Sequence, residues 1–393
     1  MGADVRDADA TDGTPGLESA GFVQVVTRAD GDALAASGII ARALAERETP
    51  FQVTVGRTVA ERTERVEAAD AGTDDLTLSI GATDGDAPRL DDPDRPATTA
   101  AVEVARDLGA SPDPVLALAG LVAAGVEPGA GDTEWLLETA RDRDLVDRRP
   151  GVAVSTADPV DDLAHSTRVR APWSGDPAAT SEALAEIDVE GTEPDLESED
   201  HRAIGSLVAL DAVGAPDATE HAAEAIGRAL KPYATPSGPF ATVGGYADVL
   251  EATARTEPGT GAALAMGHDA RDPALDAWRS YGRRAHEAIE GASTGRYDGL
   301  YVVDVDDGPV TAVGRLVAAY RSPEPTVLVT GDGEAALVAR EGPVEGATVE
   351  RIARELESAT DAVAYDVGPQ RGYLQYAPST EASTVVTTVR EVR

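Results

Sequence analysis

The residues from Phe22 onward alternate between short apolar runs and longer stretches whose apolar side chains recur at helical spacing. "FVQVVT", "PFQVTVGR" and "DLTLSIGA" are typical of strands, whereas "ALAASGIIARALAERE" and "RTVAERTERVEAA" are typical of the helices between them. Strands that alternate with helices pair in parallel, because each crossover helix returns the chain to the same edge of the sheet. The pattern therefore predicts an α/β domain with a doubly wound parallel sheet over residues 21–149.

A second domain is expected because 393 residues are too many for one ordinary core. Residues 150–234 are interpreted as a helical connector with an acidic, solvated loop at about 190–200. A smaller α/β domain follows over 235–393, with helices such as "GGYADVLEATART" and strands such as "GLYVVDVD" and "TVLVTGD". Its last segment, "STVVTTVREV", is expected to close the second sheet. Residues 1–20 are expected to be disordered.

The charge of the chain is strongly acidic, with 71 Asp and Glu against 33 Lys and Arg, a formal net charge of -38, and Lys231 as the only lysine. The acids are spread along the whole chain, which favours adaptation to molar salt over an acidic interaction tail. In molar salt the Debye length falls to about 3 Å, so that repulsion between the acids is screened. Counterion release then drives little binding to nucleic acid, and contacts would depend on hydrogen bonds, a few arginines and stacking.

Other global features narrow the class of protein. The chain has no cysteine, which excludes disulfides and thiolate metal sites. No apolar run is long enough to span a bilayer, and the acidic N-terminus is unlike a signal peptide. We expect a cytoplasmic protein without membrane contact.

Two aspartates, Asp30 and Asp32, follow the first strand in "TRADGDALAASG", at a glycine-containing turn into a helix. Carboxylates in this position could share a Mn²⁺ or Mg²⁺ ion, since both metals prefer oxygen ligands. The alternative is that Asp32 caps the following helix and Asp30 is a turn residue. Residue chemistry alone favours the cap.

The same stretch resembles the first motif of the DHH phosphoesterase superfamily, a His-x-Asp-x-Asp pattern followed by a small-residue helix that carries a serine. Arg28 stands at the histidine position, with Asp30, Asp32 and Ser37 in place. Further along, "GGYADVLEATAR", "LVAR" and "VGPQRG" are similar in order and spacing to segments of the RecJ-like branch of archaea. That branch includes GINS-associated nucleases and catalytically silent relatives in the replicative helicase assembly. The resemblance implies a DHH-type domain followed by a DHHA1-type nucleic-acid-binding domain.

The chain departs from this family where the family binds two metal ions. The third strand ends at Ile80 and Gly81, where a second-motif aspartate is expected. All five histidines lie beyond the first domain: His165, His201, His221, His268 and His286. A two-metal site with imidazole ligands cannot form from that domain alone.

Aspartates could still replace the missing ligands. The loop after the third strand supplies several that could bind a hard cation together with Asp30 and Asp32: Asp84, Asp86, Asp91, Asp92 and Asp94. In so acidic a chain a solvated loop is the favoured interpretation. A guanidinium supplies the positive charge that a metal would, so we hypothesise that an ion pair of Arg28 with Asp30 and Asp32 replaces the metal.

The resemblance also implies residues that grip nucleic acid. In the second domain the matching positions are Arg340 and Gln370, with Arg371 beside them, and we add Ser37 and Arg255 as candidates. An arginine can bind a phosphate through two hydrogen bonds, but exposed surface charge is an equal alternative for Arg340 and Arg371.

The connector offers one more pair of notable residues, His165 and Trp173. Their spacing provides no Ser-His-Asp geometry, and a connector loop that packs on a domain face is the better interpretation.

The sequence thus favours a catalytically degenerate scaffold, or a component that binds single-stranded DNA, in DNA replication or repair. GINS or replicative helicase subunits are the expected partners, and no cofactor is expected. Two alternatives stay open. One is an active single-strand exonuclease or phosphodiesterase that uses Mn²⁺ or Mg²⁺, and the other is a nucleotide-binding module at the cleft between the domains.

Overall fold

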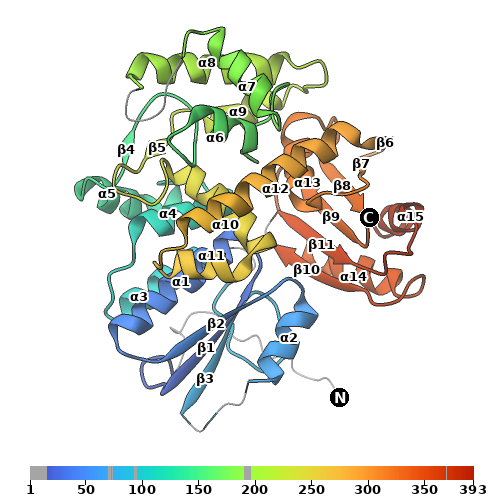
Figure 1. The fold of residues 1–393 in the computed structure, drawn as a ribbon. Helices are drawn as coiled ribbons and strands as arrows, with labels where there is room; N and C mark the ends of the chain where they lie inside the picture. The colour runs from blue at the N-terminus through green and yellow to red at the C-terminus, as the bar shows by residue number, and fades with distance from the viewer. Residues whose placement is uncertain (1–15, 70–71, 73, 93–94, 190–195, 369) are drawn as a thin grey trace.

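The computed structural model describes residues 16–69, 72, 74–92, 95–189, 196–368 and 370–393. The predicted disordered N-terminus lies mostly outside the described residues, as does much of the predicted acidic loop. Figure 1 shows a central group of helices, with the first sheet below it, the second sheet to its right and the connector helices above it.

The first sheet has three parallel strands in the order β2-β1-β3: β1 (Phe22–Arg28), β2 (Phe51–Gly56) and β3 (Asp75–Ile80). The crossovers run through α1 (Gly31–Glu46) and α2 (Val59–Glu67). Because β2 and β3 lie on either side of β1, right-handed crossovers put the two helices on opposite faces of the sheet. The predicted doubly wound sheet is confirmed.

Helix α1 is buried around nearly its whole circumference. The sheet covers one side, and the other side contacts four helices: α3 (Ala97–Asp107), α4 (Pro114–Ala123), α10 (Val243–Thr256) and α11 (Pro258–Ala265). Its small residues allow this crowding. The start of α1, with Asp30 as its N-cap and Asp32 in its first turn, is therefore deep inside the molecule.

The connector is helical, as predicted. It follows a short 3₁₀ turn (Gly131–Thr133) and α5 (Glu134–Asp142), and a two-stranded ribbon of β4 (Asp147–Arg148) and β5 (Tyr233–Ala234) brackets it. Its helices are α6 (Pro159–His165), α7 (Pro177–Ala185), α8 (Ser198–Gly214) and α9 (Ala222–Ala229).

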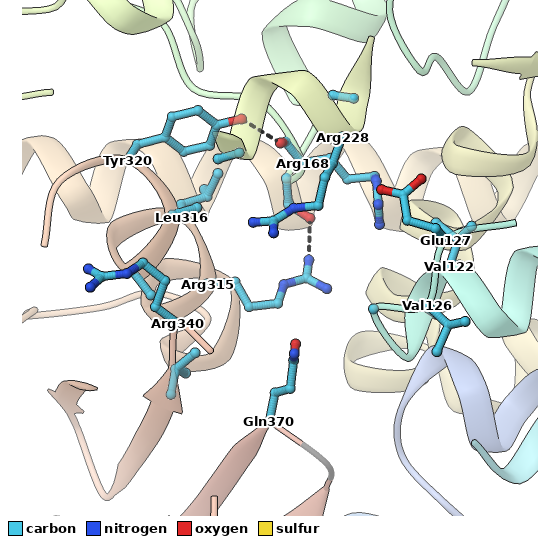
Figure 2. A pocket seen from close by; sticks show the side chains of 18 of the residues that line it. Val122, Val126, Glu127, Arg168, Arg228, Arg315, Leu316, Tyr320, Arg340 and Gln370 are labelled. Carbon is cyan, nitrogen blue, oxygen red and sulfur yellow. Dashed lines mark hydrogen bonds between the residues drawn. The ribbon is translucent and has the colours of Figure 1, made fainter. Parts of the chain in front are cut away.

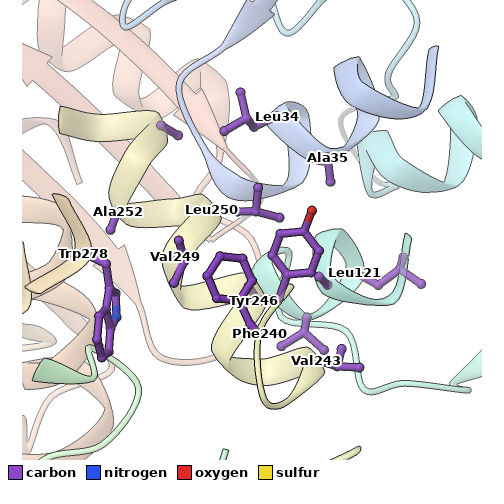
Figure 3. Packing of buried hydrophobic residues seen from close by; sticks show 14 of the residues in the cluster. Leu34, Ala35, Leu121, Phe240, Val243, Tyr246, Val249, Leu250, Ala252 and Trp278 are labelled. Carbon is purple, nitrogen blue, oxygen red and sulfur yellow. The ribbon is translucent and has the colours of Figure 1, made fainter. Parts of the chain in front are cut away.

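Helices α10 and α11 come after residue 235 yet pack against α1, and α10 also packs against α4. Figure 3 shows the resulting core, in which Tyr246, Val249 and Leu250 of α10 lie among Leu34 and Leu121 of the first domain. The second sheet begins only after α12 (Arg271–Gly291). The proposed boundary at residue 235 thus precedes two helices that contribute to the first core.

The second sheet has six strands in the order β10-β11-β9-β8-β7-β6. They are β6 (Ser293–Tyr297), β7 (Leu300–Asp304), β8 (Thr326–Gly331), β9 (Glu334–Ala339), β10 (Ala364–Gly368) and β11 (Arg371–Gln375). Only the pair β7–β8, joined through α13 (Val310–Tyr320), is parallel. One face of the sheet packs on α13, and the other packs on α14 (Gly346–Leu356) and α15 (Ala382–Val392).

The prediction for the C-terminal segment was wrong, because residues 382–392 form helix α15 and not a strand. Val385, Thr388 and Val389 are its buried residues, and their spacing of three and four is helical. These three residues form a buried face of α15 that packs on α14 and the sheet. The β-branched residues that suggested a strand therefore belong to a helix. In the described part of the chain, no helix is both long and apolar enough to cross a membrane.

Candidate functional site

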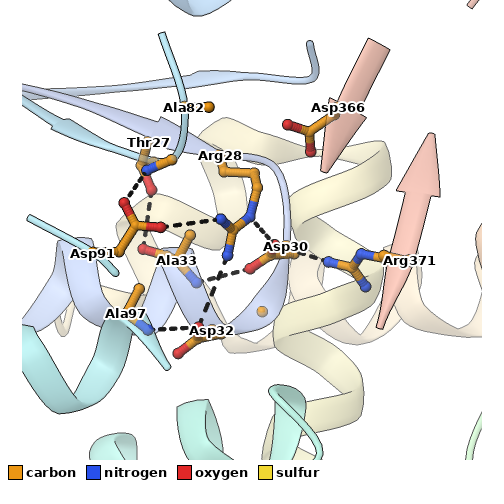
Figure 4. Close-up of polar contacts among 12 residues, drawn as sticks. Thr27, Arg28, Asp30, Asp32, Ala33, Ala82, Asp91, Ala97, Asp366 and Arg371 are labelled. Carbon is orange, nitrogen blue, oxygen red and sulfur yellow. Dashed lines mark hydrogen bonds and ion pairs between the residues drawn. The ribbon is translucent and has the colours of Figure 1, made fainter. Parts of the chain in front are cut away.

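The end of β1 places the side chain of Arg28 among three carboxylates (Figure 4). Its Nε donates to Asp30, its Nη1 lies 3.3 Å from Asp91 Oδ2, and its Nη2 lies 3.9 Å from Asp32 Oδ2. None of the four residues is more than 6% exposed. The hypothesised ion pair of Arg28 with Asp30 is therefore present, and the guanidinium fills the space between the carboxylates.

The two aspartates also cap helices. Asp30 accepts a hydrogen bond from Ala33 N at 2.8 Å and is the N-cap of α1. Asp32 accepts from Ala97 N at 2.8 Å and from Thr98 N at 2.9 Å, at the start of α3. The expectation that Asp32 caps the following helix was wrong: Asp30 caps it, and Asp32 caps a helix that lies beyond the third strand.

The interpretation of the loop after β3 as solvated was wrong for Asp91, whose side chain is buried. Leu90 N donates to Ser79 O, which pairs the loop with β3 and carries Asp91 over Gly81. Asp91 accepts from Gly81 N at 2.6 Å and from Arg89 Nε at 2.9 Å. By contrast Asp84 and Asp86 are exposed, and Asp94 lies outside the described residues.

Arg371, from β11 of the second sheet, reaches into the same cluster. Its Nη2 lies 2.9 Å from Asp30 Oδ2, and its Nη1 lies 2.7 Å from Glu251 Oε1 on α10. Glu251 also accepts from Gly31 N at 2.9 Å. The side chain of Arg371 is only 12% exposed, so the alternative of an exposed surface charge was wrong for this residue.

Two further ion pairs link the sheet domains. Arg62 of α2 contacts Asp366 of β10 at 2.6 Å, and both side chains are buried. Arg57 contacts Glu334 of β9 at 3.1 Å. We call the three links, Arg371–Asp30, Arg62–Asp366 and Arg57–Glu334, the interdomain clamp.

The pKa values of the acids follow from burial and from these neighbours. Burial, reinforced by the charge of Asp30, raises the pKa of Asp32 to about 6. Burial acts on Asp30 as well, but Arg28 and Arg371 outweigh it and hold the pKa of Asp30 well below its usual range. Against the same burial, Arg371 and Arg255 lower the pKa of Glu251 to about 2.

A divalent metal does not fit this arrangement. Over the described residues, no group of three His, Asp or Glu side chains is placed to hold a metal ion. The oxygens of Asp30, Asp32 and Asp91 face backbone N–H groups and guanidinium groups, and two arginine cations lie where a metal would have to bind.

The remaining predicted residues fall into two groups. Ser37 is buried in α1 and donates to Leu34 O, and Arg255 is buried beside Glu251, so neither side chain is placed to contact a nucleic acid strand. Arg340 and Gln370 line a cavity. In the connector, His165 lies edge-on to Trp278, and Trp173 is buried and donates to Asp211; both pack as expected.

The cavity holds about 220 Å³ and lies where the end of α4, the connector and the second sheet domain meet (Figure 2). Four arginines line it: Arg168, Arg228, Arg315 and Arg340. Glu127 is the one acidic residue among the described residues that line it. We call it the arginine cavity.

A smaller cavity of about 60 Å³ adjoins the arginine cavity and shares Arg315 and Gln370 with it. Arg28, Asp30, Asp32 and Arg371 form its far wall, so the ion cluster closes this end. No sequence pattern indicated Arg168, Arg228 or Arg315, because they come from segments far apart in the chain.

Comparison with solved structures shows the fold. CDC45 from Entamoeba histolytica superposes with a TM-score of 0.60 at 9% identity, over 94% of this chain and 95% of that one. The structure of exonuclease RecJ bound to manganese gives a TM-score of 0.46 at 15% identity, over 96% and 90%. The expected architecture of a DHH-type sheet domain and a smaller second domain is confirmed by the likeness to CDC45, which concerns the fold alone.

Comparison with sequences shows the family. A model for the C-terminal domain of the uncharacterized protein rrnAC1427 matches residues 292–391. The protein rrnAC1427 of Haloarcula marismortui is 45% identical over 327 residues, which cover 83% of each chain. The chain therefore belongs to the family of rrnAC1427.

Proposed function

We propose that this protein is a catalytically silent member of the DHH-type fold and acts as a scaffold in DNA replication or repair. The observation that carries the proposal is the position of Arg28, whose guanidinium lies between three buried carboxylates. A fixed cation there takes the place of a catalytic metal, and no metal-bound water is then available as a nucleophile.

The interdomain clamp suits a scaffold. Arg371 and Arg62 each join a buried carboxylate across the two sheet domains, and separating the domains would leave these charges unpaired. The clamp thus favours one relative position of the domains and a constant surface for a partner. GINS or replicative helicase subunits are the proposed partners, supported by the motif resemblance and the fold shared with CDC45.

Contact with single-stranded DNA is a further part of the proposal. Of the residues suggested by sequence, Arg340 and Gln370 support this part of the proposal, because both line the arginine cavity. Arg371 belongs to the clamp and is not available.

The direct test is hydrolysis. A labelled single strand is incubated with the purified protein and Mn²⁺ in molar KCl, alongside the Asp30→Asn, Asp32→Asn double variant. We expect both proteins to release the same background level of nucleotide. Release by the unchanged protein that disappears in the double variant would overturn the proposal and favour the exonuclease.

The scaffold role is tested by affinity purification of the tagged protein from its own salt-rich cytoplasm. Recovery of GINS or helicase subunits is the expected outcome. Their absence under conditions that retain other complexes would contradict the proposed role.

A further inference from the structure

Two of the four arginines of the arginine cavity, Arg168 and Arg340, form no ion pair with any described residue, whereas Arg228 and Arg315 each have an acidic neighbour. Acids outnumber bases by more than two to one in the sequence, and buried arginines elsewhere, such as Arg28 and Arg62, contact carboxylates. In the cavity, Arg340 Nη1 is 3.2 Å from the carbonyl oxygens of Ser322 and Glu324. The Nε atoms of Arg340 and Arg168 are buried without a hydrogen-bond partner among the described residues.

The other two cavity arginines differ in exposure. Arg228 is half-exposed on α9 and contacts the exposed Glu224 at 3.1 Å. Arg315 donates to Thr167 Oγ1 at 2.7 Å and lies 3.9 Å from Asp248. A cluster of cations of this kind repels itself unless an anion joins it.

The walls of the cavity are held in place by buried hydrogen bonds. Asp248 of α10 accepts from Trp278 Nε1 and from Thr167 N, both at 2.9 Å, and so fixes the segment that orients Arg315. Tyr320 Oη donates to Arg168 O at 2.9 Å and ties the connector to α13 (Figure 2). The arginines are therefore preorganised, which lowers the entropic cost of binding a ligand.

The chemistry of the lining indicates the class of ligand. Guanidinium groups bind phosphate through paired hydrogen bonds. Figure 2 shows Arg340 pointing away from the other three arginines, and the three guanidinium groups of Arg168, Arg228 and Arg315 suit a compact anion with more than one negative charge. Val122, Val126 and Leu316 add an apolar wall that could cover the body of a larger ligand.

We propose that the arginine cavity binds the terminal phosphate of a nucleotide or of a single strand, with Arg168 and Arg228 of the connector among its ligands. The inference deepens the proposed function and rests on it in one respect: the bound phosphate ester is held without cleavage, because the adjoining ion cluster offers no metal.

Calorimetric titration in molar KCl tests the inference with AMP, pyrophosphate and adenosine as probes. We expect AMP and pyrophosphate to bind and adenosine not to bind. A strand with a 5′-phosphate should displace AMP if strand ends are the source of the phosphate, whereas the same strand without it should not. If neither strand displaces AMP, free nucleotides are the source. Equal binding of AMP and adenosine, or no binding of any phosphate probe, would overturn the inference.

Variants identify the residues. Arg168→Gln and Arg228→Gln should each weaken AMP binding about tenfold, the loss expected for one charged hydrogen bond. Arg202→Gln, an exposed position on α8, makes the same change of charge and should have no effect. Because Arg228 is half-exposed, its variant should fold even if the Arg168 variant does not, and thermal melts check this. Equal losses in all three variants would show that the cavity is not the site.

The two proposals fail separately. Absence of phosphate binding would not contradict the proposal that the ion cluster of Arg28 replaces a metal. Hydrolysis that depends on Mn²⁺ would contradict the proposal that the protein is catalytically silent, even if AMP binds in the cavity.

Discussion

Arg28 carries a permanent charge into a space that three carboxylates share. Removing one partner from a buried ion cluster leaves the others uncompensated, so Arg28→Gln should lower the free energy of unfolding by roughly 3–5 kcal/mol. The matched control is Arg42→Gln, whose pair with Asp113 is partly exposed and should be worth about 1 kcal/mol or less. Denaturant titration in molar KCl measures both changes. Similar losses in the two variants would contradict the central position of Arg28.

Asp32 gives the protein a specific dependence on pH. Because its pKa is raised from 3.8 to about 6, its contribution to stability is fully present below 3.8 and is lost as the pH rises through about 6. Asp30 and Glu251, with lowered pKa values, act in the opposite sense and weaken the fold only below about pH 4.

Asp32→Asn should therefore reduce the gain in stability on going from about pH 7 to about pH 5 by on the order of 1 kcal/mol, because only about one unit of the shifted range, from about pH 6 to about pH 5, is crossed. Denaturant titrations at the two pH values give the comparison. The same gain in the variant and in the unchanged protein would show that Asp32 does not titrate in this range.

For single residues, contacts between side chains close together in the sequence were predictable, whereas contacts between side chains far apart in the sequence were not. Arg28 and Asp30 are two residues apart at the end of one strand, so their pairing followed from local geometry. Arg371 lies 120 residues from Glu251, and nothing in either segment indicates that the second sheet delivers an arginine to the first turn of α1.

Helices and strands were predictable where their burial produces a periodic pattern of apolar residues in the sequence. The first sheet and α1 have apolar runs because they are covered on both sides. Strand β6, with the sequence "STGRY", is an edge strand with mostly exposed side chains and carries no such signal. Helix α15 has β-branched residues, and only their helical spacing, confirmed by contact with α14, reveals the element.

Helix α10 makes a close contact that can be tested. A Cβ built on Gly245 would lie 1.9 Å from the carbonyl oxygen of Val154, so Gly245→Ala should push α10 away from the connector and destabilise the protein. Gly227, within α9, has nothing within 4 Å of the same position, and Gly227→Ala should stabilise by up to about 1 kcal/mol. The melting temperatures of both variants, compared with that of the unchanged protein, test this prediction. A gain at both positions would mean that the contact is absent in solution.

The whole molecule carries a net charge of -38, which repels itself in dilute buffer. At about 0.01 M salt the Debye length is about 30 Å, so the acids act on one another across most of the protein. We expect the melting temperature to fall steeply when KCl is lowered from molar concentration. Circular dichroism at a series of KCl concentrations measures this, and a melting temperature that does not change would contradict screening as the basis of stability.

The central claim, that an arginine stands in the place of the metal, concerns the whole molecule because Asp30 pairs both with Arg28 and with Arg371 of the interdomain clamp, which joins both sheet domains. Calorimetric titration of the intact protein with Mn²⁺ in molar KCl tests it most directly, with the Asp30→Asn, Asp32→Asn double variant as the control. The account predicts no specific binding heat in either protein. Tight binding of Mn²⁺ to the intact protein that is lost in the double variant would contradict it.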